Sequence, residues 1–313
     1  MTRKLGFLFP GQGSQTVGMG KELYVAGGAS QELYETADKI LGFKLSKICF
    51  EGPEEDLTQT FHTQPAIVAT SMALVREFMS HGVSPAMTAG HSVGEYAALA
   101  LAGVLSFEEV IDLVYNRGKL MDEACPAGTG GMAALIGMDL KKTEDLLENL
   151  PLPLDQILDV AGLNCPGQVV IAGHREALEM AVAKVRDFGG RMGVMLNVSG
   201  PFHSRLMQPA AKGLSGRLSG LEFSDASIPV VPNVCPEPEN RGESLKDCLI
   251  SQLTCPVKWE ASIRAMLNSG ITEFVEFGAG NVLMGMIKKI DRKLRVHPVF
   301  DKESLEQGVR ELS

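Results

Sequence analysis

Short apolar runs alternate with longer segments of helical periodicity along most of this chain, and few folds accommodate that alternation. Runs typical of buried strands lie at 5–9, 87–90, 229–233 and 273–277. Helical segments lie between them, for example at 66–80, directly after Pro65, and at 107–122. Strands that alternate with helices are typical of an α/β domain with a mostly parallel sheet.

The pattern changes between residues 129 and 198. Here the chain runs through a strand at 132–137, a helix at 140–150, two strands on either side of Gly167, a helix at 175–188 and a strand at 192–197. That order is βαββαβ, the ferredoxin-like unit. Because α/β segments resume after it, we expect 129–198 to be a small subdomain inserted into a larger core of 1–128 and 199–313. A cleft between the two is a natural ligand site.

Composition excludes several classes of protein. The chain of 313 residues has a formal net charge of −9, whereas proteins that bind nucleic acid need a dense basic surface. Its longest apolar run, 97–105, is too short to cross a membrane. The six cysteines include no Cys-X-X-Cys pair, so neither a zinc site nor a disulfide framework is indicated. We therefore expect a cytoplasmic protein with no metal site.

The pentapeptide Gly90-His91-Ser92-Val93-Gly94 lies between a predicted strand and a predicted helix. In that context the two glycines permit a sharp turn with the serine hydroxyl at its tip and the next backbone N–H free to receive an oxyanion. A plain glycine-rich turn would have the same composition. The flanking strand and helix favour a nucleophilic serine, which needs a base within hydrogen-bonding distance. His91 itself is expected to point away from the serine.

Two further residues are candidates to act with this serine. His203 follows a predicted strand where the chain returns to the core, so it is the best candidate for the base, although a capping or core histidine would fit there too. Arg117 lies on the inward face of the helix at 107–122. A guanidinium cannot lose its proton and is costly to bury unpaired. Its partner is either an acidic residue of the fold or a substrate carboxylate.

Taken together, these motifs closely resemble the malonyl-CoA:acyl-carrier-protein transacylase family. The resemblance covers essentially the whole chain, through Phe9-Pro10-Gly11-Gln12-Gly13, Thr63-Gln64-Pro65-Ala66, Gly90-His91-Ser92-Val93-Gly94-Glu95, Arg117-Gly118, Asn164-Cys165-Pro166-Gly167-Gln168-Val169-Val170, Phe202-His203-Ser204 and Gln252-Leu253. Several ordered motifs at matching spacing are far more specific than one pentapeptide. The family's fold, a hydrolase-like α/β core with an inserted ferredoxin-like subdomain, matches the organisation expected above.

The resemblance implies a role for each matching catalytic position. Ser92 would be the nucleophile and His203 its general base and acid. The backbone N–H groups of Gln12 and Val93 would donate to the oxyanion. In this family a main-chain carbonyl orients the histidine in place of an aspartate, and the matching position here is Gln252.

The resemblance also implies how the substrate is held. Arg117 would bind the malonyl carboxylate, with Phe202, Met121 and Asn164 as further substrate-binding residues. Phe202 resembles the malonyl-selective members, because a serine there is associated with the bulkier methylmalonyl group. Val93 stands where leucine is more usual in the family. This departure is small, since the expected contribution of that residue is its backbone N–H.

The implied reaction is transfer of malonyl from malonyl-CoA to the phosphopantetheine thiol of holo acyl carrier protein, in fatty acid biosynthesis. It would follow a ping-pong mechanism through a malonyl-serine, in a monomer that needs no bound cofactor, nucleic acid or membrane. Two rival interpretations remain. A serine hydrolase or thioesterase would share the same turn and histidine, and a catalytically inactive module that binds acyl carrier protein would share the fold.

Overall fold

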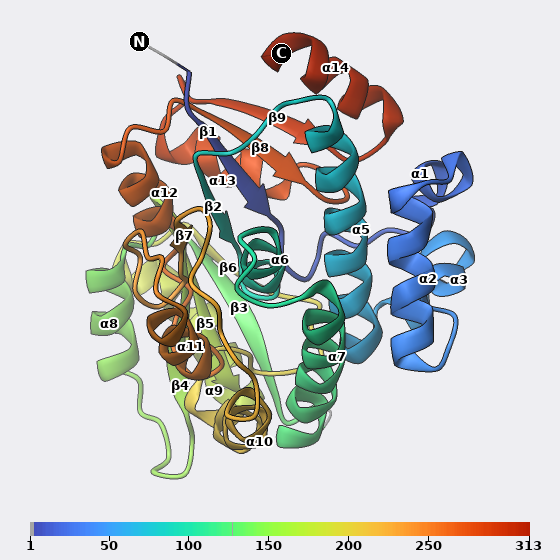
Figure 1. The fold of residues 1–313 in the computed structure, drawn as a ribbon. Coiled ribbons are helices and arrows are strands. Elements are labelled where there is room, and N and C mark those ends of the chain that lie inside the picture. The colour runs from blue at the N-terminus through green and yellow to red at the C-terminus, as the bar shows by residue number, and fades with distance from the viewer. Residues whose placement is uncertain (1–2, 127) are drawn as a thin grey trace.

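The computed structural model describes residues 3–126 and 128–313, and its larger sheet is entirely parallel (Figure 1). The strand order is β7-β2-β1-β8-β9, formed by β1 (Leu5–Phe9), β2 (Met87–Gly90), β7 (Val230–Val231), β8 (Glu273–Phe277) and β9 (Arg295–Val299). Three predicted strands have the bounds expected from the sequence, and the strand predicted at 229–233 is shorter. The prediction of an α/β fold is confirmed.

Helices connect and cover the strands. They are α1 (Lys21–Ala26), α2 (Ala29–Leu41), α3 (Leu45–Glu51), α4 (Glu54–Leu57), α5 (Thr60–Ser80), α6 (Gly94–Leu101), α7 (Phe107–Ala124), α8 (Leu140–Glu148), α9 (Arg175–Lys184), α10 (Gln208–Leu218), α11 (Gly242–Ser251), α12 (Trp259–Asn268), α13 (Val282–Ile290) and α14 (Lys302–Leu312), with 3-10 turns at Val185–Phe188 and Arg205–Met207. Within the described residues, none of these helices is both long enough and apolar enough to span a membrane.

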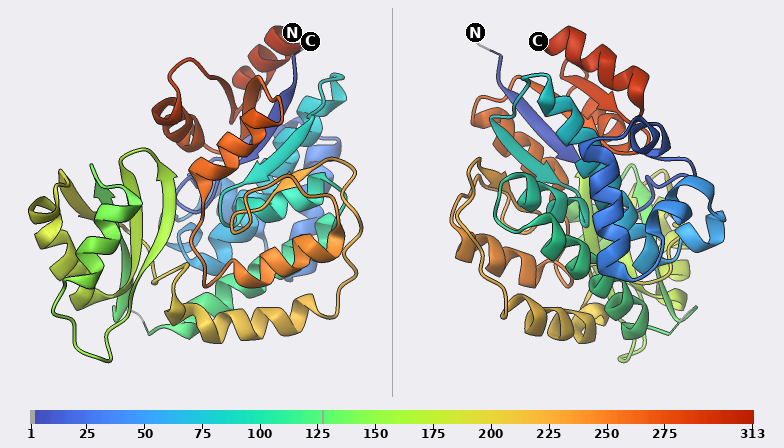
Figure 2. Two further views of the ribbon diagram at one scale, coloured as in Figure 1. Left: turned by 90° about the vertical axis from the view of Figure 1, so that its left-hand side faces the viewer. Right: turned by 45° about the vertical axis from the view of Figure 1, so that its right-hand side comes forward.

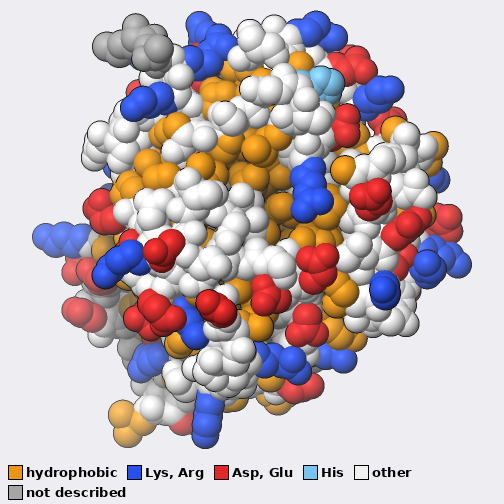
Figure 3. Space-filling model, viewed as in Figure 1, with side chains coloured by type: hydrophobic (Ala, Val, Ile, Leu, Met, Phe, Trp, Pro, Cys, Tyr) orange, Lys and Arg blue, Asp and Glu red, His pale blue; other side chains and the backbone are white. Residues whose placement is uncertain are grey.

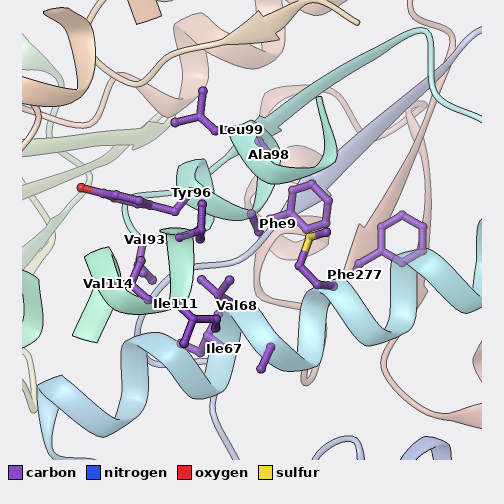
Figure 4. Close-up of a cluster of buried hydrophobic side chains, with 14 of the residues drawn as sticks. Phe9, Ile67, Val68, Val93, Tyr96, Ala98, Leu99, Ile111, Val114 and Phe277 are labelled. Carbon is purple, nitrogen blue, oxygen red and sulfur yellow. The ribbon is translucent and has the colours of Figure 1, made fainter. Parts of the chain in front are cut away.

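The two faces of the parallel sheet are buried against different helices. Phe7, Phe9 and Phe277 point to one face and belong to the main core with residues of α5, α6 and α7. Figure 4 shows part of this core, in which Phe9, Phe277, Val68, Tyr96 and Ile111 belong to one cluster. The alternate residues Leu8 and Phe274 point to the other face and pack with α12 and α13. Burial on both faces explains why β1 is continuously apolar rather than alternating, whereas β8 carries the buried Glu276.

Helix α5 begins six residues earlier than the sequence pattern predicts. We expected a start after Pro65 because proline lacks the N–H that a helix interior needs. The helix instead includes Pro65, and the backbone carbonyl of Gln59 accepts hydrogen bonds from the N–H groups of His62 and Thr63. The early start places the Gln64 side chain within the core, where it is fully buried.

A second, antiparallel sheet lies beside the core. Its order is β4-β5-β3-β6, formed by β3 (Gly130–Ile136), β4 (Leu158–Cys165), β5 (Gln168–His174) and β6 (Met192–Met195). One face packs against α8 and α9, which Figure 2 (left) shows on the side away from the core. Met132, Ala134 and Val170 on the other face join the main core. The predicted ferredoxin-like element order is therefore observed.

The molecular surface is mixed in charge on the face shown in Figure 3. Hydrophobic side chains gather near the middle of this face, and acidic and basic side chains are interspersed around them. No continuous basic stripe of the kind that tracks a nucleic-acid backbone lies on this face among the described residues.

The turn between β2 and α6 brings backbone segments into direct contact. A Cβ atom at Gly90 would overlap the main chain at Gly94, and a Cβ at Gly94 would overlap the carbonyl of Phe9. Neither obstacle is a flexible side chain, so only glycine fits at the two positions. The tight turn places Ser92 beyond the carboxyl end of β2, where ligands bind in parallel α/β sheets.

We expect Gly94→Ala to lower the free energy of unfolding by about 1–3 kcal/mol, because the added methyl group must displace backbone. The matched control is Gly216→Ala, at an exposed position of α10 where a Cβ meets no atom within 4 Å. That change should raise the free energy of unfolding by up to about 1 kcal/mol. Urea unfolding followed by circular dichroism measures both, and a Gly94→Ala protein as stable as the wild type would contradict the argument.

Candidate active site

Ser92 is held at the tip of the turn in a conformation that non-glycine residues seldom adopt. Its φ angle is +52°, in the left-handed region. The Ser92 N–H donates to Asn233 Oδ1 at 2.7 Å, and Asn233 Nδ2 donates to the carbonyl of Gly90 at 2.6 Å. Because Asn233 is fully buried, it ties both sides of the turn to the end of β7. A backbone of this kind is retained only where the surroundings impose it.

His203 reaches Ser92 from the chain segment that leaves the small sheet. Its Nε2 lies 2.8 Å from Ser92 Oγ, and its Nδ1 lies 2.8 Å from the main-chain carbonyl oxygen of Gln252. A carbonyl only accepts, so Nδ1 carries the proton and Nε2 is left to accept from the serine. Burial, together with the positive charge of Arg117, lowers the pKa of His203 to about 3. The imidazole is therefore neutral and able to take the serine proton.

Arg117 extends from α7 to the same point and is 1% exposed. Its Nη2 donates to Ser92 Oγ at 3.2 Å and to Gln252 Oε1 at 3.1 Å, and its Nη1 donates to Gln64 Oε1 at 2.8 Å. These acceptors are uncharged. Within the described residues Arg117 forms no ion pair with an acidic side chain. The sequence left two possible partners for Arg117, and among the described residues no acidic side chain of the fold contacts it. The guanidinium would therefore stabilise a negative charge beside Ser92.

A cavity of about 230 Å³ opens above Ser92 between the core and the small sheet. Six predicted site residues besides Ser92 and His203 line it: Gln12, Val93, Arg117, Met121, Asn164 and Phe202. The remaining wall is largely apolar and comes from the small sheet, through Met132, Ala134, Val170 and neighbouring residues. Gln252 lies behind His203, outside this lining. The structure therefore brings all nine predicted residues to one place.

The expected oxyanion donors lie on two loops that meet at the cavity. Gln12 follows β1, and Val93 follows Ser92. Within the described part of the chain, neither main-chain N–H makes a hydrogen bond to another protein group. Two unpaired N–H groups at the cavity that holds the serine hydroxyl suit the negative oxygen of a tetrahedral intermediate.

His91, which was expected to point away from the serine, makes no hydrogen bond with Ser92 among the described residues. It borders the cavity, with Nε2 3.0 Å from Asn164 Oδ1 and its ring edge-on to Trp259. Burial lowers the pKa of His91, which favours a neutral ring that donates to the asparagine oxygen. The small sheet thus supplies Asn164 as a partner for His91.

Sequence reasoning did not single out Gln64, Glu95 and Asn233. Gln64 and Glu95 belong to motifs that carry the family resemblance, so their position was a signal although no role was assigned to them. Asn233 ends the strand predicted at 229–233 and offered no signal in the sequence. Its role depends on the parallel pairing of β2 with β7, which places Asn233 beside the turn.

The cavity combines Ser92 with a neutral histidine, two available N–H groups and a buried guanidinium, and this arrangement is suited to acyl transfer through a serine. A model of the acyl transferase domain family matches residues 6–301 of the chain. The chain is 43% identical over 309 residues to the malonyl CoA-acyl carrier protein transacylase of Bacillus subtilis (strain 168), which covers 99% of this chain and 97% of that protein.

Solved structures agree with this assignment. The malonyl CoA-acyl carrier protein transacylase from Coxiella burnetii matches with a TM-score of 0.95 at 38% identity, over 99% of this chain and 98% of that one. A malonyl-transacylase in complex with a type II PKS acyl-carrier protein matches with a TM-score of 0.94 at 39% identity, over 98% and 99% of the two chains. The chain belongs to the family of malonyl CoA-acyl carrier protein transacylases, and the resemblance of its motifs is confirmed.

We expect His203 to remain neutral throughout the range from pH 8 to pH 5, because burial and the charge of Arg117 both oppose its protonation. Histidine-selective NMR, with the resonance assigned by its loss in His203→Gln, measures the titration. In Arg117→Met the titration midpoint of His203 should rise, since the variant lacks the positive charge that opposes protonation of the histidine. A wild-type midpoint near the ordinary histidine value would contradict the expectation.

Proposed function

We propose that this protein transfers the malonyl group of malonyl-CoA to the phosphopantetheine thiol of holo acyl carrier protein, through a malonyl ester of Ser92, for fatty acid biosynthesis. One observation carries the proposal. The buried Arg117 guanidinium lies 3.2 Å from Ser92 Oγ and forms no ion pair with an acidic side chain among the described residues. An acyl group that brings its own carboxylate to the serine supplies the missing charge.

The first half-reaction forms the malonyl-enzyme. Ser92 Oγ attacks the thioester carbonyl carbon while its proton passes to His203 Nε2, 2.8 Å away. The carbonyl oxygen becomes an oxyanion, which the N–H groups of Gln12 and Val93 stabilise. When the intermediate collapses, the C–S bond breaks and the histidine returns its proton to the sulfur of coenzyme A. Malonyl-Ser92 and neutral His203 remain.

The second half-reaction runs the same steps toward a different thiol. The phosphopantetheine thiol of the carrier attacks the serine ester, and its proton passes to His203 Nε2. Collapse of the second intermediate returns that proton to Ser92 Oγ and releases malonyl-carrier. Protons and electrons balance over the two steps with Ser92 and His203 alone, which supports the proposal that the enzyme works without a resident cofactor.

Arg117 accounts for the choice of acyl group. The malonyl carboxylate is one methylene away from the carbonyl that Ser92 attacks, so it meets the guanidinium that already contacts Ser92 Oγ. An acetyl group would fill the cavity and leave a buried cation without its anion. A site built around a polar partner can reject an analogue that lacks it by about four orders of magnitude.

We further propose that the enzyme acts as a monomer in the cytoplasm. The six cysteines are all unpaired in the structure, which suits a reducing compartment. All the groups that the two half-reactions use come from one chain, so the chemistry requires no second copy.

Intact-protein mass spectrometry tests the transfer itself. After brief mixing with malonyl-CoA we expect one malonyl adduct, absent from Ser92→Ala, that persists for minutes and then discharges when holo acyl carrier protein is added. An adduct that is lost as free malonate at the same rate without carrier would instead identify a hydrolase. A folded protein that takes up no malonyl group would leave only a binding module.

Selectivity tests the role of Arg117. In Arg117→Ala the ratio of kcat/KM for malonyl-CoA to that for acetyl-CoA should fall by about a hundredfold to a thousandfold, because the variant lacks the cation that pairs with the malonyl carboxylate. Arg76→Ala, which removes an exposed arginine from α5, serves as the matched control and should leave the ratio unchanged. Equal losses for the two donors would count against the assignment.

A further inference from the structure

Glu95 is a buried carboxylate that the proposed chemistry does not use. It lies in the first turn of α6 and is 1% exposed. Its Oε2 accepts the N–H of Asn233 at 3.0 Å and Gln252 Nε2 at 2.8 Å. These two partners come from separate segments of the chain, and each also holds a part of the active site. A single carboxylate oxygen therefore joins the two segments behind Ser92.

The contact with Glu95 determines which way the Gln252 side chain is turned. Gln252 Nε2 donates to Glu95 and to the Ser92 carbonyl, while Gln252 Oε1 accepts from Arg117 Nη2. If the amide were reversed, its NH₂ group would face the guanidinium, and both groups would be donors. The main-chain carbonyl of the same residue accepts from His203 Nδ1. Glu95 thus holds, through Gln252, both the arginine and the histidine.

The charge of Glu95 acts on Arg117 as well. Three titratable groups interact electrostatically with the Glu95 carboxylate. They are Arg117 on α7, the Tyr96 hydroxyl on α6 and the Cys248 thiol on α11. Of these, only Arg117 is a cation. The carboxylate therefore partly compensates the guanidinium from behind, without contacting it directly, and an incoming acyl carboxylate must compete with that charge.

We propose that Glu95 is a positioning residue with two separable effects. In the first, its hydrogen bonds fix Gln252 and hence the alignment of His203 with Ser92. In the second, its charge lowers the affinity of Arg117 for an anionic acyl group. The second effect rests on the proposed function. This effect keeps the affinity of the site for the malonyl group moderate, which permits its release to the carrier.

Two variants separate the effects. Glu95→Gln keeps an acceptor oxygen at nearly the same distance and removes the charge. Glu95→Asp keeps the charge and withdraws it by one methylene from Asn233 and Gln252. The control is Glu276→Gln, which neutralises another buried carboxylate, one that accepts the N–H groups of Leu283 and Met284. Thermal unfolding confirms that each variant is folded.

Single-turnover acylation of Ser92 at pH 8 is the measurement. In Glu95→Gln the half-saturating concentration of malonyl-CoA should fall by about threefold to tenfold, with that of acetyl-CoA unchanged. In Glu95→Asp the limiting rate should fall by about tenfold with either donor, with half-saturation unchanged. Glu276→Gln should leave the ratio of the half-saturating concentrations of malonyl-CoA and acetyl-CoA as it is in the wild type. Parallel rate losses in both Glu95 variants, with no difference between donors, would overturn the proposal.

A pH series gives an independent readout. Burial raises the pKa of Glu95 to about 7, so the carboxylate becomes protonated and loses its charge as the pH falls below that value. The difference in half-saturation between wild type and Glu95→Gln should therefore shrink from pH 8 to pH 6. A difference that stays constant over this range would contradict the electrostatic effect.

Labelling by an uncharged fluorophosphonate separates this inference from the proposed function, because it requires an activated Ser92 but no malonyl group. A wild-type protein that reacts with the fluorophosphonate and takes no malonyl adduct would refute the proposed function. The positioning effect would still be tested, since Glu95→Asp should be labelled about tenfold more slowly than wild type. Equal labelling rates would refute it.

Discussion

The burial of the Arg117 guanidinium against uncharged partners is the constraint on which the site depends. Such a cation is costly in a protein interior. Here the amide oxygens of Gln64 and Gln252 and the Ser92 hydroxyl accept from its two Nη atoms, while its Nε has no hydrogen-bond partner within the described residues. Burial, together with this charge, lowers the pKa of His203 and so keeps its imidazole neutral. In the proposed mechanism, one buried cation thus contributes both to the selectivity for malonyl and to the neutral state of His203.

Stability and reactivity are coupled around the turn that carries Ser92. Both Ser92 and His203 have positive φ angles, +52° and +59°, which the chain adopts only under restraint. For Ser92 the restraint comes from close backbone packing at Gly90 and Gly94 and from the side chain of Asn233. The rigid parallel sheet and α6 therefore maintain the geometry, while the small sheet closes the cavity over it.

Much of this arrangement was predictable because it is local. The strands at 5–9, 87–90 and 273–277 are short, mostly apolar runs buried on both faces, and the local sequence was sufficient to predict their bounds. The turn at Ser92 follows from the spacing of two glycines. The start of α5 was not predictable from the proline rule, because the carbonyl of Gln59 caps residues upstream of Pro65. The hydrogen bond of His91 with Asn164 was not predicted either, since Asn164 is supplied by the small sheet.

The sequence by itself determined the α/β class, the inserted ferredoxin-like unit and the candidate residues, because periodicity, glycine spacing and ordered motifs are properties of neighbouring positions. It left open whether Arg117 pairs with an acidic residue of the fold, and it assigned no role to Glu95 or Asn233. Only the tertiary structure decided these points. Hydrogen bonds between residues more than one hundred positions apart, such as those of Gln252 with Arg117 and Glu95, depend on how strands and helices pack in three dimensions, and no local pattern records that packing.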